Sequence, residues 1–112
     1  MTISLGAVVR DRFGREGIVC SKEAPPSEDW LKEQVGVSDI RHLATETEWW
    51  GVMPFGGGYL LCPEPELEWL RSATFEDFLA LVDTATVHGR ERLAKLFPHF
   101  VERLLGERHR PH

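Results

Sequence analysis

Residues 48–62 read Glu48-Trp49-Trp50-Gly51-Val52-Met53-Pro54-Phe55-Gly56-Gly57-Gly58-Tyr59-Leu60-Leu61-Cys62. Aromatic and β-branched residues, which favour strands, stand on both sides of a glycine-rich turn. The pattern therefore predicts an antiparallel hairpin with its turn at residues 54–58. Consecutive glycines also occur in phosphate-binding loops, but those continue into Lys-Ser/Thr and a helix, and here a strand follows.

The beginning of the chain predicts a second strand pair. Residues 5–20 contain two clusters of β-branched residues separated by a polar stretch with glycines. Gly14 and Gly17 offer the positive φ values that a tight connection or a bulge needs. Residues 21–47 follow as an insertion between strands, in which Ser27 caps a short helix carrying Trp30, Leu31 and Val35.

The hydrophobic period becomes helical after Ser72. We expect a first helix behind the N-cap Thr74, a second over residues 86–97, and a third that begins at Pro98 and ends near Gly106. The third carries four apolar residues on one face: Phe100, Val101, Leu104 and Leu105. Residues 66–70, between the hairpin and these helices, fit either a last strand or one helical turn.

Length and composition predict a single α+β domain. The chain has 112 residues, of which 42% are hydrophobic, and this is enough for one core but not two. We divide it into a β part (1–71), a helical part (72–106) and a flexible tail (107–112). It has no apolar run long enough for a transmembrane helix and no secretion signal at its start, which favours a cytoplasmic protein.

Two glycine-punctuated segments carry a resemblance to a known family. Gly6-Ala7-Val8-Val9 followed by Gly14-Arg15-Glu16-Gly17-Ile18-Val19 resembles the opening strand pair of SH3-like barrels, including KOW-type modules. The resemblance implies a five-stranded barrel whose loops and exposed aromatic residues bind protein or nucleic acid. The expected fold is thus a small SH3-like antiparallel β-barrel followed by a C-terminal helical segment. Those helices could either seal the barrel or form the seam of a homodimer.

Charge is unevenly distributed along the chain. The net charge is −5, but residues 1–88 carry 7 basic and 15 acidic side chains, whereas residues 89–112 carry 6 basic and 3 acidic ones. An acidic body repels nucleic acid and steers basic proteins toward itself. Arg10, Arg12 and Arg15 could clamp a phosphate, but with Asp11 and Glu16 between them we favour local ion pairs.

The predicted binding surface combines acidic and aromatic residues from the second half of the β part. Trp49 and Trp50 should point to opposite faces of a strand, so that one of them is exposed or meets the insertion or a helix. If this stretch is extended, Glu64, Glu66 and Glu68 share one strand face, where they suit an acidic rim better than acid–base catalysis. The partner-binding residues predicted in this way are Glu46, Glu48, Trp49, Trp50, Phe55, Tyr59, Glu64, Glu66 and Glu68.

Reactive side chains form no motif for catalysis, for a metal or for a cofactor. Cys20 and Cys62 lack CxxC spacing and are interpreted as small buried hydrophobic residues, not as ligands or a disulfide. The five histidines are not spaced as metal ligands, and a Cys20–His42 or Cys20–His88 pair would require proximity that the sequence does not indicate. We therefore expect a protein that is not an enzyme.

These observations give two functional hypotheses. The first is a non-enzymatic protein-binding module, of the immunity- or antitoxin-protein type, whose acidic and aromatic surface neutralises a basic protein. The alternative follows the KOW-like resemblance and is a nucleic-acid-binding accessory protein that uses Arg10, Arg12, Arg15 and the basic C-terminal helices. The acidic body favours the first.

Overall fold

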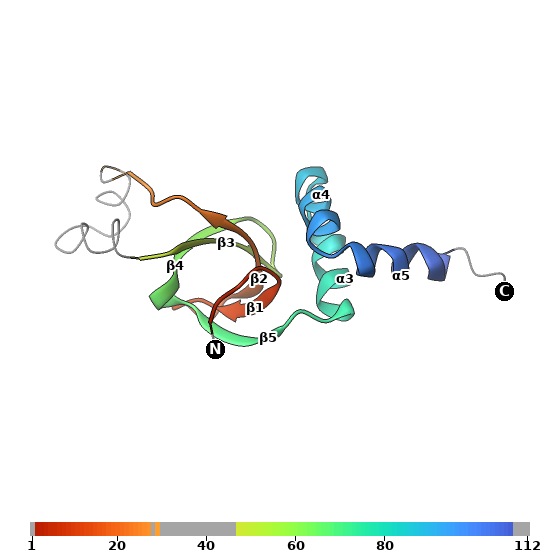
Figure 1. The fold of residues 1–112 in the computed structure, drawn as a ribbon, viewed down its shortest axis with the longest axis horizontal. Helices are drawn as coiled ribbons and strands as arrows, with labels where there is room; N and C mark the ends of the chain where they lie inside the picture. The colour runs from red at the N-terminus through yellow and green to blue at the C-terminus, as the bar shows by residue number, and fades with distance from the viewer. Residues whose placement is uncertain (1, 28, 30–46, 109–112) are drawn as a thin grey trace.

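The computed structural model describes residues 2–27, 29 and 47–108, which form one antiparallel sheet followed by three helices (Figure 1). The strands are β1 (Ala7–Arg10), β2 (Glu16–Glu23), β3 (Trp49–Pro54), β4 (Leu60–Pro63) and β5 (Glu68–Ser72), in the order β4-β3-β2-β1-β5. The helices are α3 (Phe75–Thr84), α4 (Val87–Leu96) and α5 (Pro98–Arg108). The predicted α+β class and the C-terminal helical segment are confirmed.

The sheet is curled but is not a closed barrel. Strands β4 and β5 are its two edges, and each pairs with a single neighbour, β3 and β1 respectively. The prediction of a barrel is therefore wrong in one point, because β4 and β5 do not pair to close the sheet. The predicted helix with Trp30, Leu31 and Val35 falls outside the described residues.

Glycine explains the β3–β4 hairpin and the close approach of β2 and β3. In the predicted turn, Gly57 and Gly58 have φ values of 99° and 90°, which residues with a side chain rarely adopt. The sequence predicts a positive φ angle at both Gly14 and Gly17. Gly14 has one, but Gly17 does not, so the prediction at Gly17 is wrong. Gly17 is needed for another reason: a Cβ atom there would collide with the backbone of Met53 on β3.

The sequence left open whether a helical turn or a last strand follows the hairpin, and the structure has both. A 3₁₀ turn, η1 (Glu64–Glu66), comes directly before β5. Pro65 suits the first turn of a helix, where no backbone N–H is required. Glu64 and Glu66 therefore lie in a turn and only Glu68 is in a strand, so the prediction that all three share one strand face is wrong.

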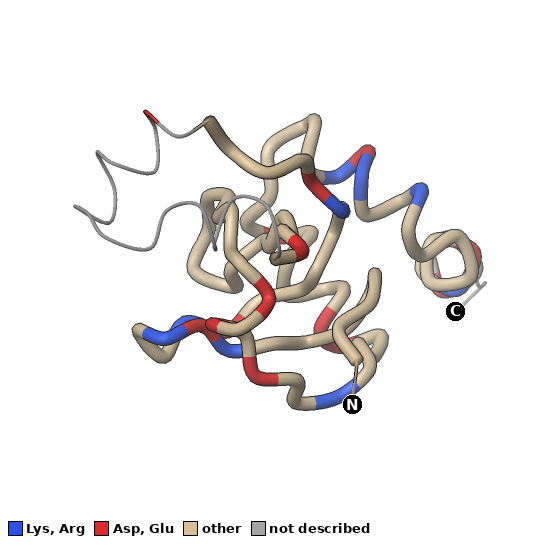
Figure 2. The backbone as a smooth tube through the Cα atoms, turned by 60° about the vertical axis from the view of Figure 1, so that its left-hand side comes forward, with Lys and Arg blue, Asp and Glu red and all other residues tan. Residues whose placement is uncertain are grey.

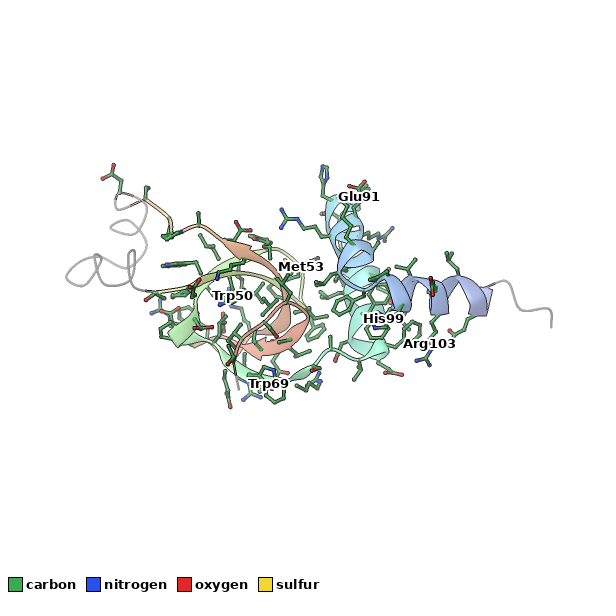
Figure 3. The ribbon with its side chains drawn as sticks, in the orientation of Figure 1. Trp50, Met53, Trp69, Glu91, His99 and Arg103 are labelled. Atoms are coloured by element: carbon green, nitrogen blue, oxygen red, sulfur yellow. The ribbon has the colours of Figure 1, made fainter. Side chains whose placement is uncertain are left out.

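The sheet buries both of its faces, in two separate hydrophobic clusters. One cluster fills the curl of the sheet and includes Val9, Val19 and Trp50; the other lies between the sheet and the helices and includes Ile18 and Met53 (Figure 3). Successive strand residues alternate between these clusters. The expected single core is thus replaced by two. Since neither face of β3 is open to solvent, Trp49 and Trp50 are only 3% and 7% exposed.

The helices begin where the sequence predicts. The Thr74 side chain accepts from the backbone N–H of Asp77, and the Asp77 carboxylate accepts from Thr74, which makes a capping box for α3. Thr86 is the N-cap of α4, and its side chain accepts a hydrogen bond from the backbone N–H of Gly89. Helix α5 continues to Arg108, so the predicted stop at Gly106 is wrong. None of the helices in the described part of the chain could cross a membrane.

Helix α5 projects away from the sheet while its first turn packs against α3 (Figure 1). The Phe100 ring lies 5.8 Å from that of Phe75 and 5.6 Å from that of Phe78, and Arg103 lies over the Phe75 ring. Of the four apolar residues predicted on one face, three pack against the core, whereas Leu105 is 48% exposed. We conclude that α5 closes the end of the helical cluster near α3.

Candidate binding groove

The aromatic residues predicted to hold a partner differ sharply in exposure. Trp49 and Trp50 are both buried, so exposure, one of the possibilities that the sequence left open for the second tryptophan, is wrong. Phe55 is half-buried against the cluster between sheet and helices. Tyr59, at the end of the hairpin turn, is 46% exposed. Among the four, Tyr59 is therefore the one that presents most of its ring to a partner.

The acidic residues of the predicted surface are mostly occupied by partners in the same chain. Glu48 pairs with Lys22 at 2.8 Å, Glu66 with Arg12 at 3.2 Å and Glu68 with Arg10 at 3.3 Å. Glu64 accepts a hydrogen bond from the Trp50 indole. Glu46 lies outside the described residues. The structure thus does not gather these carboxylates into one uncompensated acidic face.

The predicted ion pairs around the β1–β2 turn are confirmed. Arg10 pairs with Glu16, and Arg15 with Asp11. Asp11 is buried, which raises its pKa, but hydrogen bonds from the backbone and side chain of Arg15 and from the backbone of Phe13 outweigh burial and lower the pKa overall. The turn is therefore held by Asp11, and its arginines are neutralised rather than offered to phosphate.

A groove of about 580 Å³ lies between the β3–β4 hairpin and helices α3 and α4. Its floor is apolar and is formed by residues of both sides: Met53, Pro54, Leu61, Leu81 and Ala85. Gly89 of α4 allows this arrangement, because a Cβ atom there would lie 2.9 Å from Cε of Met53 and 3.1 Å from Cβ of Ala85. The hairpin, the helix pair and a close helix–strand contact thus fix the shape of the groove.

Hydroxyl and carboxylate groups form a small network on one wall of the groove. The Tyr59 and Ser21 hydroxyls both donate to Oε1 of Glu23, at 2.7 and 2.6 Å, and lie 3.0 Å apart. These bonds lower the pKa of Glu23. Gly51 makes room for the network, since a Cβ atom at this position would collide with both hydroxyls. The Tyr59 ring is therefore fixed in place at the rim.

Arg92 of α4 completes this wall. Its guanidinium lies 5.4 Å from the centre of the Tyr59 ring, and hydrogen bonding to the Tyr59 hydroxyl and to the Cys20 thiol raises its pKa. Arg92 also borders a second hollow of about 250 Å³, together with Cys20, Ser21, Lys95 and Leu96. One arginine thus stands between an apolar groove and a smaller, more basic hollow.

Comparisons with protein-family models, with curated proteins and with solved structures each gave no match.

The pKa values of both cysteine thiols are raised. Burial raises the pKa of the Cys20 thiol, despite contacts with Ser21 and Arg92 that lower it, and the Cys62 pKa is raised to about 11. The His88 side chain, on the rim, is 94% exposed. Within residues 2–27, 29 and 47–108, no three His, Cys, Asp or Glu side chains form a group that could hold a metal ion.

Sequence reasoning identified Tyr59 but missed the other residues of the groove. Ser21, Glu23 and Arg92 come from the two ends of the chain, and their approach to Tyr59 depends on the β2–β3 pairing and on the packing of α4. The excess of basic residues after residue 88 was a weak signal for Arg92. Gly51 and Gly89 were a second signal. Neither lies in a turn, so each indicates a position where another part of the chain comes too close for a side chain.

Proposed function

We propose that this protein is a non-enzymatic protein-binding module that holds a segment of its partner in the groove between the β3–β4 hairpin and α4. The observation that carries the proposal is the groove itself: about 580 Å³ with an apolar floor and a few polar groups at one wall. Such a site suits ligands that bury apolar side chains and are oriented by a small number of hydrogen bonds.

Tyr59 is the proposed aromatic anchor. A half-exposed tyrosine at a groove rim offers a large apolar surface and loses little conformational entropy on binding. The hydroxyl network with Ser21 and Glu23 already fixes its orientation, so this part of the binding cost is met before the partner arrives. The aromatic contact of the proposed module therefore lies at Tyr59, not at Trp49 or Trp50.

The immunity- or antitoxin-type role is one form of this proposal, in which the bound segment belongs to a toxin. Steering of a basic partner by Glu48, Glu66 and Glu68 would be weakened by the lysine and arginines paired with them.

The KOW-like alternative loses contacts in a similar way, because Arg10, Arg12 and Arg15 all pair with carboxylates. Both cysteines are free thiols, which fits a cytoplasmic location.

Site-specific photo-crosslinking tests the proposal. A photoreactive phenylalanine analogue would replace His88, which lines the groove and is almost fully exposed, in cells that naturally make the protein. The matched control carries the same analogue at Leu105, exposed on α5 and away from the groove. We expect one discrete protein adduct from position 88 that is abolished by Leu61→Glu in the groove floor. No adduct, or equal adducts from both positions, would contradict the proposal.

A further inference from the structure

The basic residues of α4 differ from those of the sheet in having no carboxylate partner. Every lysine and arginine that the structure describes in the strands and their turns forms an ion pair: Arg10, Arg12, Arg15, Lys22 and Arg71. Among the described residues, no carboxylate lies within 4.0 Å of the side-chain nitrogens of Arg90, Arg92 or Lys95. Helix α4 holds a single acidic residue, Glu91, beside these three cations (Figure 2).

Two of these cations stand where a groove-bound segment would pass. Arg92 lines both hollows, and Lys95, one helical turn further along, lines the smaller one with Ser21. The nearest acid on the wall, Glu23, already accepts two short hydrogen bonds from hydroxyls and forms no ion pair with Arg92. Arg92 attracts the Glu23 carboxylate from beyond ion-pair distance and contacts Tyr59 and Cys20, but among the described residues neither Arg92 nor Lys95 has a carboxylate within 4.0 Å, so each can still pair with a carboxylate of a ligand.

We infer that the partner segment is acidic: it places an apolar side chain in the groove and an Asp or Glu carboxylate on Arg92 and Lys95. The inference rests on the proposed function and specifies its partner. A guanidinium binds a carboxylate through two parallel hydrogen bonds, and the adjoining ammonium adds a third contact. The apolar floor and the two cations lie side by side, so one short segment of alternating character reaches both.

The net charge of −5 does not oppose this assignment. Exposed charges are screened beyond a Debye length of about 8 Å at physiological ionic strength, so a ligand at α4 responds mainly to the charges near it. Residues 89–112 carry an excess of three basic side chains. Most acids of the sheet and its turns pair with bases of the same region, whereas Glu23 and Glu64 are held by hydrogen bonds instead. The region that attracts an acidic segment is thus the helical end of the molecule.

Selection from a display library of random peptides, each about ten residues long, tests the inference on the full chain. The bait proteins are the wild type, Leu61→Glu in the groove floor, and the double variant Arg92→Gln/Lys95→Gln. The matched control is Arg90→Gln, which removes a cation of the same helix that lines neither hollow. Leu61 lies outside both hydrophobic clusters, so we expect the floor variant to fold, and circular dichroism checks it.

We expect the wild type and Arg90→Gln to enrich peptides that combine a large apolar residue with a nearby Asp or Glu. The double variant should keep the apolar preference and lose the acidic one. A selected peptide should bind the double variant with an affinity about tenfold or more below that for the wild type. Replacing the peptide's Glu with Gln should lower its affinity for the wild type by the same factor and leave its affinity for the double variant unchanged.

Three outcomes would count against us, and they are distinguishable. Enrichment of apolar peptides without acids, or with basic residues, would overturn this inference and leave the proposed groove intact. Equal enrichment on the wild type and on Leu61→Glu would overturn the proposed function itself. Binding of a single-stranded RNA of about 20 nucleotides that is tighter than peptide binding and is lost in the double variant would assign these cations to nucleic acid instead.

Discussion

The sheet and helix α4 use their charged residues in opposite ways. In the sheet and its turns, each described lysine and arginine meets a carboxylate of the same chain, and Asp11 and Asp77 are buried while they do so. On α4, the three cations meet none among the described residues. The difference teaches that the net charge of a chain does not describe its local charge, because a paired cation is neutralised by its carboxylate whereas a cation without one keeps its positive field.

The Arg71–Asp77 ion pair holds the beginning of helix α3. The Asp77 carboxylate accepts from Arg71 and also from the backbone and hydroxyl of Thr74, where α3 begins. We expect Asp77→Ala to lower the free energy of unfolding by about 2–3 kcal/mol, since it removes a cap and half of a partly buried pair. Urea denaturation measures this. Glu76→Ala, an exposed neighbour on the same turn, should change stability by less than about 0.5 kcal/mol; equal losses would contradict the pairing argument.

The buried carboxylate of Asp11 predicts a loss of stability in acid. Its folded-state pKa lies below the ordinary value of 3.8, so the stabilisation is present above that pH and is lost as the pH falls below 3.8 through the folded pKa. Asp11→Ala should cost about 1–2 kcal/mol at neutral pH. The difference between variant and wild type should shrink below pH 3.8 when unfolding is followed at a series of pH values. If the difference in free energy of unfolding between the two proteins did not change with pH, the negative charge of Asp11 would not contribute to stability.

Tyr59→Phe tests the hydroxyl network on the groove wall. Removal of one hydroxyl should cost about 0.5–1.5 kcal/mol, and it should raise the pKa of Glu23 toward 4.5 because the carboxylate loses a donor. NMR titration of the Glu23 side chain measures the pKa. Phe13→Leu, at an exposed aromatic residue without a hydroxyl, should leave the pKa of Glu23 unchanged. If Tyr59→Phe also left it unchanged, the network would not be formed in solution.

The smallest effects compare one arginine from each region. Arg10→Gln breaks two exposed ion pairs and should cost about 0.5–1 kcal/mol at low salt, and less at high salt. Arg92→Gln should cost about 0.5–1 kcal/mol, because it removes the contacts with Tyr59 and Cys20, and this loss should be nearly the same at both salt concentrations, because no ion pair of the described residues is lost. Thermal unfolding at both concentrations measures the difference. A larger, salt-sensitive loss for Arg92→Gln would mean that its charge serves the fold after all.

Features that depend on a few neighbouring residues could be predicted from the sequence. The hairpin turn at residues 54–58, the N-cap at Thr74 and the pairs Arg10–Glu16 and Arg15–Asp11 are all of this kind. Their energies come from contacts within about six residues, so the pattern along the chain contains the information. The α+β class follows as well, because strand and helix periods occupy different halves of the chain.

Features that depend on packing between distant segments could not be predicted in this way. Alternation along β3 correctly separates Trp50 from Trp49, but whether the second face is covered depends on the helices and the rest of the chain, and both tryptophans are buried. The acids at Glu66 and Glu68 look like a free surface until β5 and η1 bring them to Arg10 and Arg12. The groove joins Glu23, Tyr59 and Arg92, which are far apart in sequence and meet only once β2, β4 and α4 are in place. Local propensities and spacing therefore set the elements, whereas burial and charge pairing, which are properties of contacts across the fold, set the site.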